Sequence, residues 1–315
     1  MTHSFDVGGL PAFVALDGYA VLSGRRRGAS IQLDETYFDG RQWALRRFDT
    51  ASDADREVRR LEASRERYDD AEVSVDAVTE TALMEASAGF RDELQRIPEL
   101  ESLARAFPGR CFVVPEWMRT GDRLQYGARV YLFRDDDAPT PEAVVRKNVE
   151  SVTADAFEEF ERYQGRLHGY PDCCIDFYRT HSQGSPSPEW RSVEPFADAV
   201  HDAALGRGVD ASIDDVVRNL DDRAGSDAFF ARAFFPEPDC ETAVIKGRTV
   251  RETLSSAFPK ELVRDYYRLN VGLNYLLARS VERRGDCRPA PGTLGREHLR
   301  FYLPLADASS APRYA

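Results

Sequence analysis

The sequence predicts an α+β protein, in which an N-terminal part with a mixed antiparallel sheet and helices precedes a mostly α-helical part. Over residues 1–137, short runs rich in Val, Phe and Tyr alternate with helical patterns, whereas almost every later signal is helical. An acidic, proline-containing segment at 135–141 separates the two, because like charges repel and each proline disfavours helix in the residue before it. We therefore predict domains at 1–137 and 138–315.

The N-terminal part is expected to contain strands on both sides of a helical region. Four apolar runs are broken by Gly and Asp, at residues 12–16, 20–22, 31–33 and 43–48. Together with the Asp-Gly pair at 39–40, a hairpin signal, they predict an antiparallel meander. Helical spacing predicts helices near 52–68 and 76–97, and Val, Phe and Tyr enrichment predicts a strand pair at 111–117 and 128–133.

The C-terminal part has the start and stop signals of successive helices. Thr140 is an N-cap candidate, with Pro141 at the first helical position. Further helices are predicted near residues 155–167, 171–180, 188–205, 213–223, 239–257 and 259–284. The last carries a broad stripe of Leu and Tyr, which is typical of a buried helix.

The charge balance disfavours two classes of partner. The formal net charge is −12, so nucleic acid and anionic lipid are repelled at long range. Lysine occurs only at Lys147, Lys246 and Lys260, and this arginine-rich, acidic composition is typical of a salt-adapted, halophilic archaeal protein. The acidity is then assigned to solvation in salt and not to a substrate.

Signals for export or membrane insertion are missing from the sequence. No run of 18 apolar residues occurs, and the N-terminus lacks the basic region of a signal peptide, so we expect a soluble, cytoplasmic protein without membrane contact. The five cysteines, an odd number, favour a reducing compartment over a disulfide framework.

One segment concentrates reactive side chains. The string His168-Gly-Tyr-Pro-Asp-Cys173-Cys174 is followed by His181, in a chain with only five cysteines and five histidines. If Tyr170 is the N-cap of a helix, the two thiols lie in its first turn, where free N–H groups and the helix dipole favour a thiolate. Adjacent helical residues point about 100° apart, so one thiol is expected in a site and one in the core, with Cys173 as the site thiol. The alternative is that both are small buried hydrophobic residues.

The string Gly-Tyr-Pro-x-Cys-Cys-x-x-Phe-Tyr resembles the signature of a largely archaeal family of poorly characterised proteins. A second, weaker match is the block at residues 235–241, which ends in Asp239-Cys240-Glu241. In the family, a further Cys or His often stands where this chain has Glu237. The resemblance implies the location of a site and no reaction.

Cys240 is the predicted partner of the pair, because Pro238 or Asp239 would begin a helix with this thiol in its first turn. Cys173, Cys174 and Cys240, with His168 or His181, would form a Cys/His set for zinc or an iron–sulfur cluster. His168 also suits the C-terminal turn of a helix before Gly169.

Other candidates carry weaker signals. Cys111 is expected in the core and Cys287 in an exposed loop, and the arginines of residues 23–28 are expected in a solvated turn. Glu158 and Glu161 lack the Glu-x-x-His partner of a di-iron site. The sequence has no P-loop, Gly-x-Gly-x-x-Gly, Gly-x-Ser-x-Gly or His-Glu-x-x-His motif.

Two functional hypotheses follow. In the first, Cys173 is a metal ligand or a catalytic nucleophile, Cys174 a second ligand or resolving thiol, and Cys240 the distal ligand. In the second, the protein is a non-catalytic, helical interaction or structural protein with buried cysteines or a structural zinc. The sequence leaves open whether the protein is an enzyme.

Overall fold

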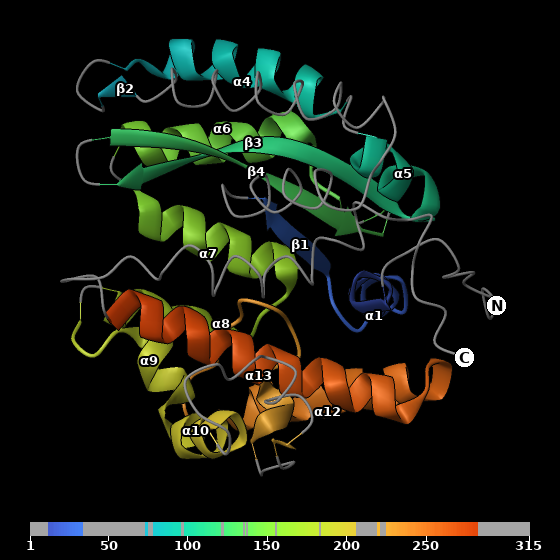
Figure 1. Ribbon diagram of the computed structural model, residues 1–315. Helices are drawn as coiled ribbons and strands as arrows, with labels where there is room; N and C mark the ends of the chain where they lie inside the picture. The colour runs from blue at the N-terminus through green and yellow to red at the C-terminus, as the bar shows by residue number, and fades with distance from the viewer. Residues whose placement is uncertain are drawn as a thin grey trace, which may run out of the picture. The chain divides into compact units, whose positions relative to one another are not determined.

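A computed structural model describes much of the chain, and Figure 1 shows its helices and strands. The described residues are 12–33, 73–74, 78–95, 98–120, 123–134, 136, 138–154, 156–182, 184–205, 219–220 and 225–282. Among them helices predominate over one small sheet with antiparallel pairing, which confirms the predicted α+β class. The described residues form two compact units, one with residues 12–15 and 30–160, the other with residues 16–29 and 161–282.

The sheet of the first unit is built around one long antiparallel pair. Strands β3 (Arg110–Thr120) and β4 (Arg123–Phe133) pair along their whole lengths, which confirms the predicted strand pair and extends it. The strands β1 (Gly28–Leu33) and β2 (Val73–Ser74) also pair with β4. The pattern of Val and aromatic residues therefore identified the centre of the sheet.

Three helices pack against β3: α4 (Glu80–Leu94), α5 (Pro98–Ala106) and α6 (Pro141–Thr153). Thr140 caps α6 as predicted, since its side chain accepts a hydrogen bond from Ala143 N–H. Buried Asn148 of α6 accepts from the backbone N–H of Trp117 (2.7 Å) and donates to its carbonyl (3.0 Å). This amide satisfies backbone groups that an edge strand would otherwise leave unpaired.

The predicted meander is wrong at its start, because α1 (Ala12–Leu22) is a single helix. Runs of five and three apolar residues do not distinguish strand from helix, and Gly18 does not end this helix. The helix is apolar around most of its circumference, and its Val14, Leu16 and Val21 are buried. The strand at 31–33 is confirmed as part of β1, whereas the runs at 39–48 and the helix at 52–68 lie outside the described residues.

The second unit is helical, as predicted. Its helices are α7 (Phe157–His168, whose first four residues belong to the first unit), α8 (Asp172–His181), α9 (Pro188–Val193), α10 (Ala197–Leu205), α12 (Glu241–Ala257) and α13 (Lys260–Glu282), with single turns η3 (Glu194–Phe196) and η4 (Ser226–Ala228). The long helix α13 packs against α9, α10, α12 and η4, so it is the buried helix expected from its apolar stripe. Most of the helix predicted at 213–223 lies outside the described residues.

A buried charge cluster joins the N-terminal segment to the helices of the second unit. Asp17 of α1 pairs with Arg26 and, at 3.1 Å, with Arg232, and it accepts a hydrogen bond from the hydroxyl of Tyr266 (2.6 Å). Arg26 is only 3% exposed. The turn at 23–28 therefore differs from the solvated turn expected, because its central arginine has a buried carboxylate partner.

Helix α12 approaches η4 closely at a glycine. A Cβ atom on Gly247 would lie 1.7 Å from the carbonyl oxygen of Asp227, so only glycine fits. The Gly247 carbonyl accepts a hydrogen bond from the hydroxyl of Tyr267 on α13 (2.7 Å). This contact fixes the position of α12, whose first residue follows Cys240.

The first compact unit extends past residue 137 to Phe160, since α6 packs on β3; the domain boundary predicted after residue 137 stays a prediction. Among the helices in the described part of the chain, none has the length and apolar character needed to cross a bilayer.

Candidate metal centre

The turn between α7 and α8 places the two adjacent thiols. Helix α7 ends at His168, as its position before a glycine predicts, and Gly169 adopts a left-handed φ of 70° that suits glycine. Pro171, and not Tyr170, is the N-cap of α8. Cys173 and Cys174 are therefore the second and third residues of the helix, one position earlier than predicted.

The segment before α12 is held by hydrogen bonds from α13 and by ring stacking. Asn270 donates to the carbonyl of Phe229 (3.0 Å), and Asn274 donates to that of Phe234 (2.6 Å). The ring of Phe234 stacks on Tyr170, with 4.2 Å between centroids. These contacts bring the segment that ends at Cys240 against the start of α8.

Cys240 is itself the N-cap of α12. Its Sγ accepts a hydrogen bond from the backbone N–H of Ala243 (3.4 Å), which replaces the usual hydroxyl or carboxylate cap. The preceding residue, Asp239, has a φ of 57°, a conformation that Asp tolerates better than most residues. The thiol thus lies one residue before the helix, whereas the sequence suggested a place within its first turn.

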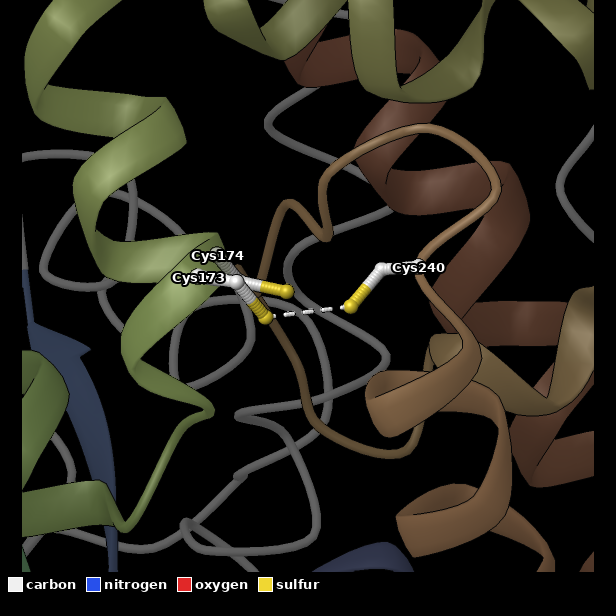
Figure 2. A group of neighbouring side chains, drawn as sticks. All are labelled: Cys173, Cys174 and Cys240. Carbon is white, nitrogen blue, oxygen red and sulfur yellow. Dashed lines mark hydrogen bonds between the residues drawn. The ribbon is translucent and has the colours of Figure 1, made fainter.

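The three thiols converge on one point. Figure 2 shows the sulfur atoms of Cys173 and Cys174 projecting from the start of α8 toward Cys240. The three Sγ atoms all lie within 4.8 Å of one another, and Sγ of Cys173 lies 3.2 Å from Sγ of Cys240. Adjacent cysteines were expected to divide between site and core, but both belong to this group.

The group has two buried thiols and one exposed thiol. Cys174 is 1% exposed and Cys240 is 9% exposed, whereas Cys173 is exposed to solvent. The backbone N–H of Glu237 donates to Sγ of Cys174 (3.4 Å). Glu237 therefore contacts one of the three thiols through its backbone.

Without a bound metal, burial has the largest effect on the pKa values of Cys173 and Cys174. Desolvation and the hydrogen bond with Cys240 raise the pKa of Cys173 above its ordinary value. Burial also raises the pKa of Cys174, although the N–H of Glu237 works in the opposite direction. The helix N-terminus alone does not produce a thiolate here, and a bound cation would supply the missing positive charge.

The two predicted histidines lie apart from the thiol group. His168 is 4% exposed and stacks on Tyr170, with 5.3 Å between ring centroids. His181 is at the opposite end of α8 from Cys173, about 12 Å along the axis at 1.5 Å per residue. Its Nδ1 is within hydrogen-bond distance of the Phe177 carbonyl (2.8 Å). Neither histidine belongs to the group, so a histidine ligand stays a prediction.

The remaining cysteines behave differently. Cys111 lies near the start of β3, half-buried, and burial raises the pKa of its thiol to about 12. Cys287 lies outside the described residues. Among the described residues, the thiols of Cys173, Cys174 and Cys240 form the one group suited to holding a metal ion.

Comparisons with known proteins give no relative: no family model, curated protein or solved structure matches this chain. The resemblance to the Gly-Tyr-Pro-x-Cys-Cys family therefore stays a prediction.

Proposed function

We propose that this protein binds one thiophilic metal ion, zinc in the first instance, through Cys173, Cys174 and Cys240. The observation that carries the proposal is the approach of three Sγ atoms to within 4.8 Å from two separate helix starts. Thiolates are soft ligands that favour zinc, copper(I) and iron–sulfur centres over magnesium or calcium.

The sulfur spacing supports a single ion more than a cluster. Two thiolates on one tetrahedral zinc, each at about 2.3 Å, lie about 3.8 Å apart. The Sγ atoms of Cys173 and Cys240 lie 3.2 Å apart, and all three Sγ atoms lie within 4.8 Å of one another, so the thiols lie at distances close to that value. In a four-iron cluster each thiolate binds a different iron, so its sulfur atoms lie farther apart.

Metal titration of the reduced protein tests this proposal. We expect one equivalent of Zn²⁺ to bind, and Co²⁺ to give thiolate charge-transfer absorption in the near ultraviolet. Mutation of a residue that only hydrogen-bonds to a metal ligand costs about 10–100-fold in metal affinity. Cys173→Ser and Cys240→Ser each remove a ligand itself, so their zinc affinity should fall by more than about 100-fold. Cys111→Ser, a thiol of the other compact unit, is the matched control and should bind like the wild type.

Two results would contradict the proposal: no cobalt–thiolate absorption in the reduced wild-type protein, or equal zinc affinity of the Cys173→Ser and Cys111→Ser variants.

Whether a histidine is a fourth ligand is tested separately. A lower affinity of His168→Gln or His181→Gln, with unchanged stoichiometry, would identify the fourth ligand.

A structural role for the ion is the second candidate function. It is favoured by the burial of Cys174 and Cys240, because one ion would then join α8 to α12. A ligand that binds only the folded state stabilises it, by about 2.7 kcal/mol at 100 times its Kd. A zinc-dependent rise in Tm that disappears in Cys240→Ser would support this role, and an unchanged Tm at saturating zinc would exclude it.

A further inference from the structure

The contact between Cys173 and Cys240 in the thiol group joins the starts of two different helices. Sγ of Cys173 and Sγ of Cys240 lie 3.2 Å apart, so little movement separates their contact from a covalent bond of about 2.05 Å. Cys173 is exposed and Cys240 is 9% exposed, so an oxidant in solution reaches Cys173 first.

The neighbouring thiols of Cys173 and Cys174 are the poorer pair. Their peptide bond is trans, which places their Cα atoms about 3.8 Å apart, below the range of about 4.4–6.8 Å that disulfides require. Cys174 is in addition 1% exposed and accepts a hydrogen bond from Glu237 N–H. Cys173 and Cys240 are therefore the two thiols that oxidation can join.

We infer that Cys173 and Cys240 form a reversible disulfide in response to hydroperoxides, with Cys174 left as a free thiol. Cys173 is the attacking residue and Cys240 the resolving residue, a role that the sequence suggested for Cys174. The disulfide does not depend on a bound metal. Where a metal is bound, formation of the disulfide removes two of its three cysteine ligands and releases the ion. This release rests on the proposed function.

The chemistry balances with hydrogen peroxide as the oxidant. The Cys173 thiol first loses its proton to water. The resulting thiolate attacks one peroxide oxygen, the O–O bond breaks, and the departing hydroxide takes a proton to form water. The Cys240 thiolate then attacks Sγ of the Cys173 sulfenic acid, an S–S bond forms, and a second hydroxide leaves as water. Two thiols and one peroxide give one disulfide and two waters, and two electrons pass from sulfur to oxygen.

Peptide mapping of the oxidised protein tests the pairing. The reduced, metal-free full chain is treated with hydrogen peroxide, its remaining thiols are alkylated, and tryptic peptides are sequenced by mass spectrometry. We expect Cys173 linked to Cys240, alkylated Cys174, and full reversal by a dithiol. Cys174→Ser should keep the cross-link and Cys173→Ser should abolish it.

Three results would overturn the inference: a link through Cys174, a Cys173–Cys174 disulfide, or sulfinic acid at Cys173 without a cross-link. Mapping of the wild-type chain decides this even where a variant fails to fold. Zinc release from the loaded protein, followed with a chromogenic chelator, is measured in parallel. Failure of the reduced protein to bind zinc would contradict the proposed function alone, whereas bound zinc that survives formation of the disulfide would contradict the coupling.

Discussion

At the residue scale, the thiols of Cys173 and Cys111 lie in different environments, and we expect them to differ in reactivity. Cys173 is exposed at the start of a helix, while Cys111 is half-buried in β3. Alkylating agents react with the thiolate, so the rate depends on both exposure and pKa. Burial raises the pKa of Cys111 to about 12, which leaves almost none of its thiolate at pH 8.

The pKa of Cys173 is raised as well, but its thiol is exposed to solvent. We therefore expect iodoacetamide at pH 8 to modify Cys173 in the folded, metal-free protein, more slowly than an ordinary exposed thiol, and to leave Cys111 unmodified. A raised pKa keeps the neutral thiol present as pH rises, so modification of Cys111 should begin only as pH approaches about 12 or when the chain unfolds. Mass spectrometry of the two peptides measures this, and denatured protein, in which both react, is the control. Equal labelling of both residues at pH 8 in the folded protein would contradict the described burial of Cys111.

At the element scale, one buried amide adds hydrogen bonds to the packing of α6 on the sheet. The side chain of Asn148 makes two hydrogen bonds to the backbone of Trp117, whose indole N–H donates to Ser87 of α4 (2.9 Å). Both helices thus depend on the position of one strand residue. A buried backbone group left unsatisfied costs about 1–3 kcal/mol.

Asn148→Ala should lower the free energy of unfolding by about 2 kcal/mol or more, because it leaves the N–H and carbonyl of Trp117 without this partner. Arg146→Ala, at an exposed position of the same helix, is the control and should change stability by less than about 0.5 kcal/mol. Urea unfolding followed by tryptophan fluorescence measures both. Similar midpoints for the two variants would show that the amide bridge contributes little.

The elements that the sequence predicts well are those whose signals are local. Thr140 followed by Pro141 identified the start of α6, and the valine and aromatic pattern identified β3 and β4. Helix α1 was missed because an apolar run looks the same in a strand and in a helix when both faces are buried. No local pattern indicates that Asn148 replaces a strand partner, since that role arises only when α6 meets β3.

The same division applies to the candidate site. The meeting of Cys173 and Cys240 was predicted from two helix starts in cysteine-bearing motifs, and the structure brings these thiols together. The supports were not predicted: the stacking of Tyr170 on Phe234 and the hydrogen bond from Asn274 are tertiary contacts between distant segments. Tyr170, next to the cysteines in the motif, was the one signal that could have pointed to them.

At the scale of the whole molecule, a carboxylate near the N-terminus organises residues far along the chain. Asp17 is 3% exposed and contacts Arg26, Arg232 and Tyr266. Removal of one partner from a buried ion pair costs about 3–5 kcal/mol, because the opposite charge stays buried without compensation.

Asp17→Asn should therefore destabilise the protein by about 3–5 kcal/mol, since neutral Asn cannot balance the two arginines. Asp198→Asn, an exposed carboxylate of α10, removes the same charge and should leave stability nearly unchanged. Chemical unfolding of both variants at one pH and ionic strength provides the comparison. An Asp17 variant as stable as its control would mean that the arginines find other partners.

This cluster also determines how the chain can be divided. Residues 16–29 belong to the same compact unit as residues 161–282, although residues 30–160 of the other unit lie between them in the sequence. A polypeptide beginning at residue 161 would retain all three cysteines of the candidate metal centre but lose the carboxylate that Arg232 and Tyr266 contact. Splitting the gene after codon 160 should therefore yield halves that fold only when co-expressed, with the N-terminal piece supplying Asp17 in trans.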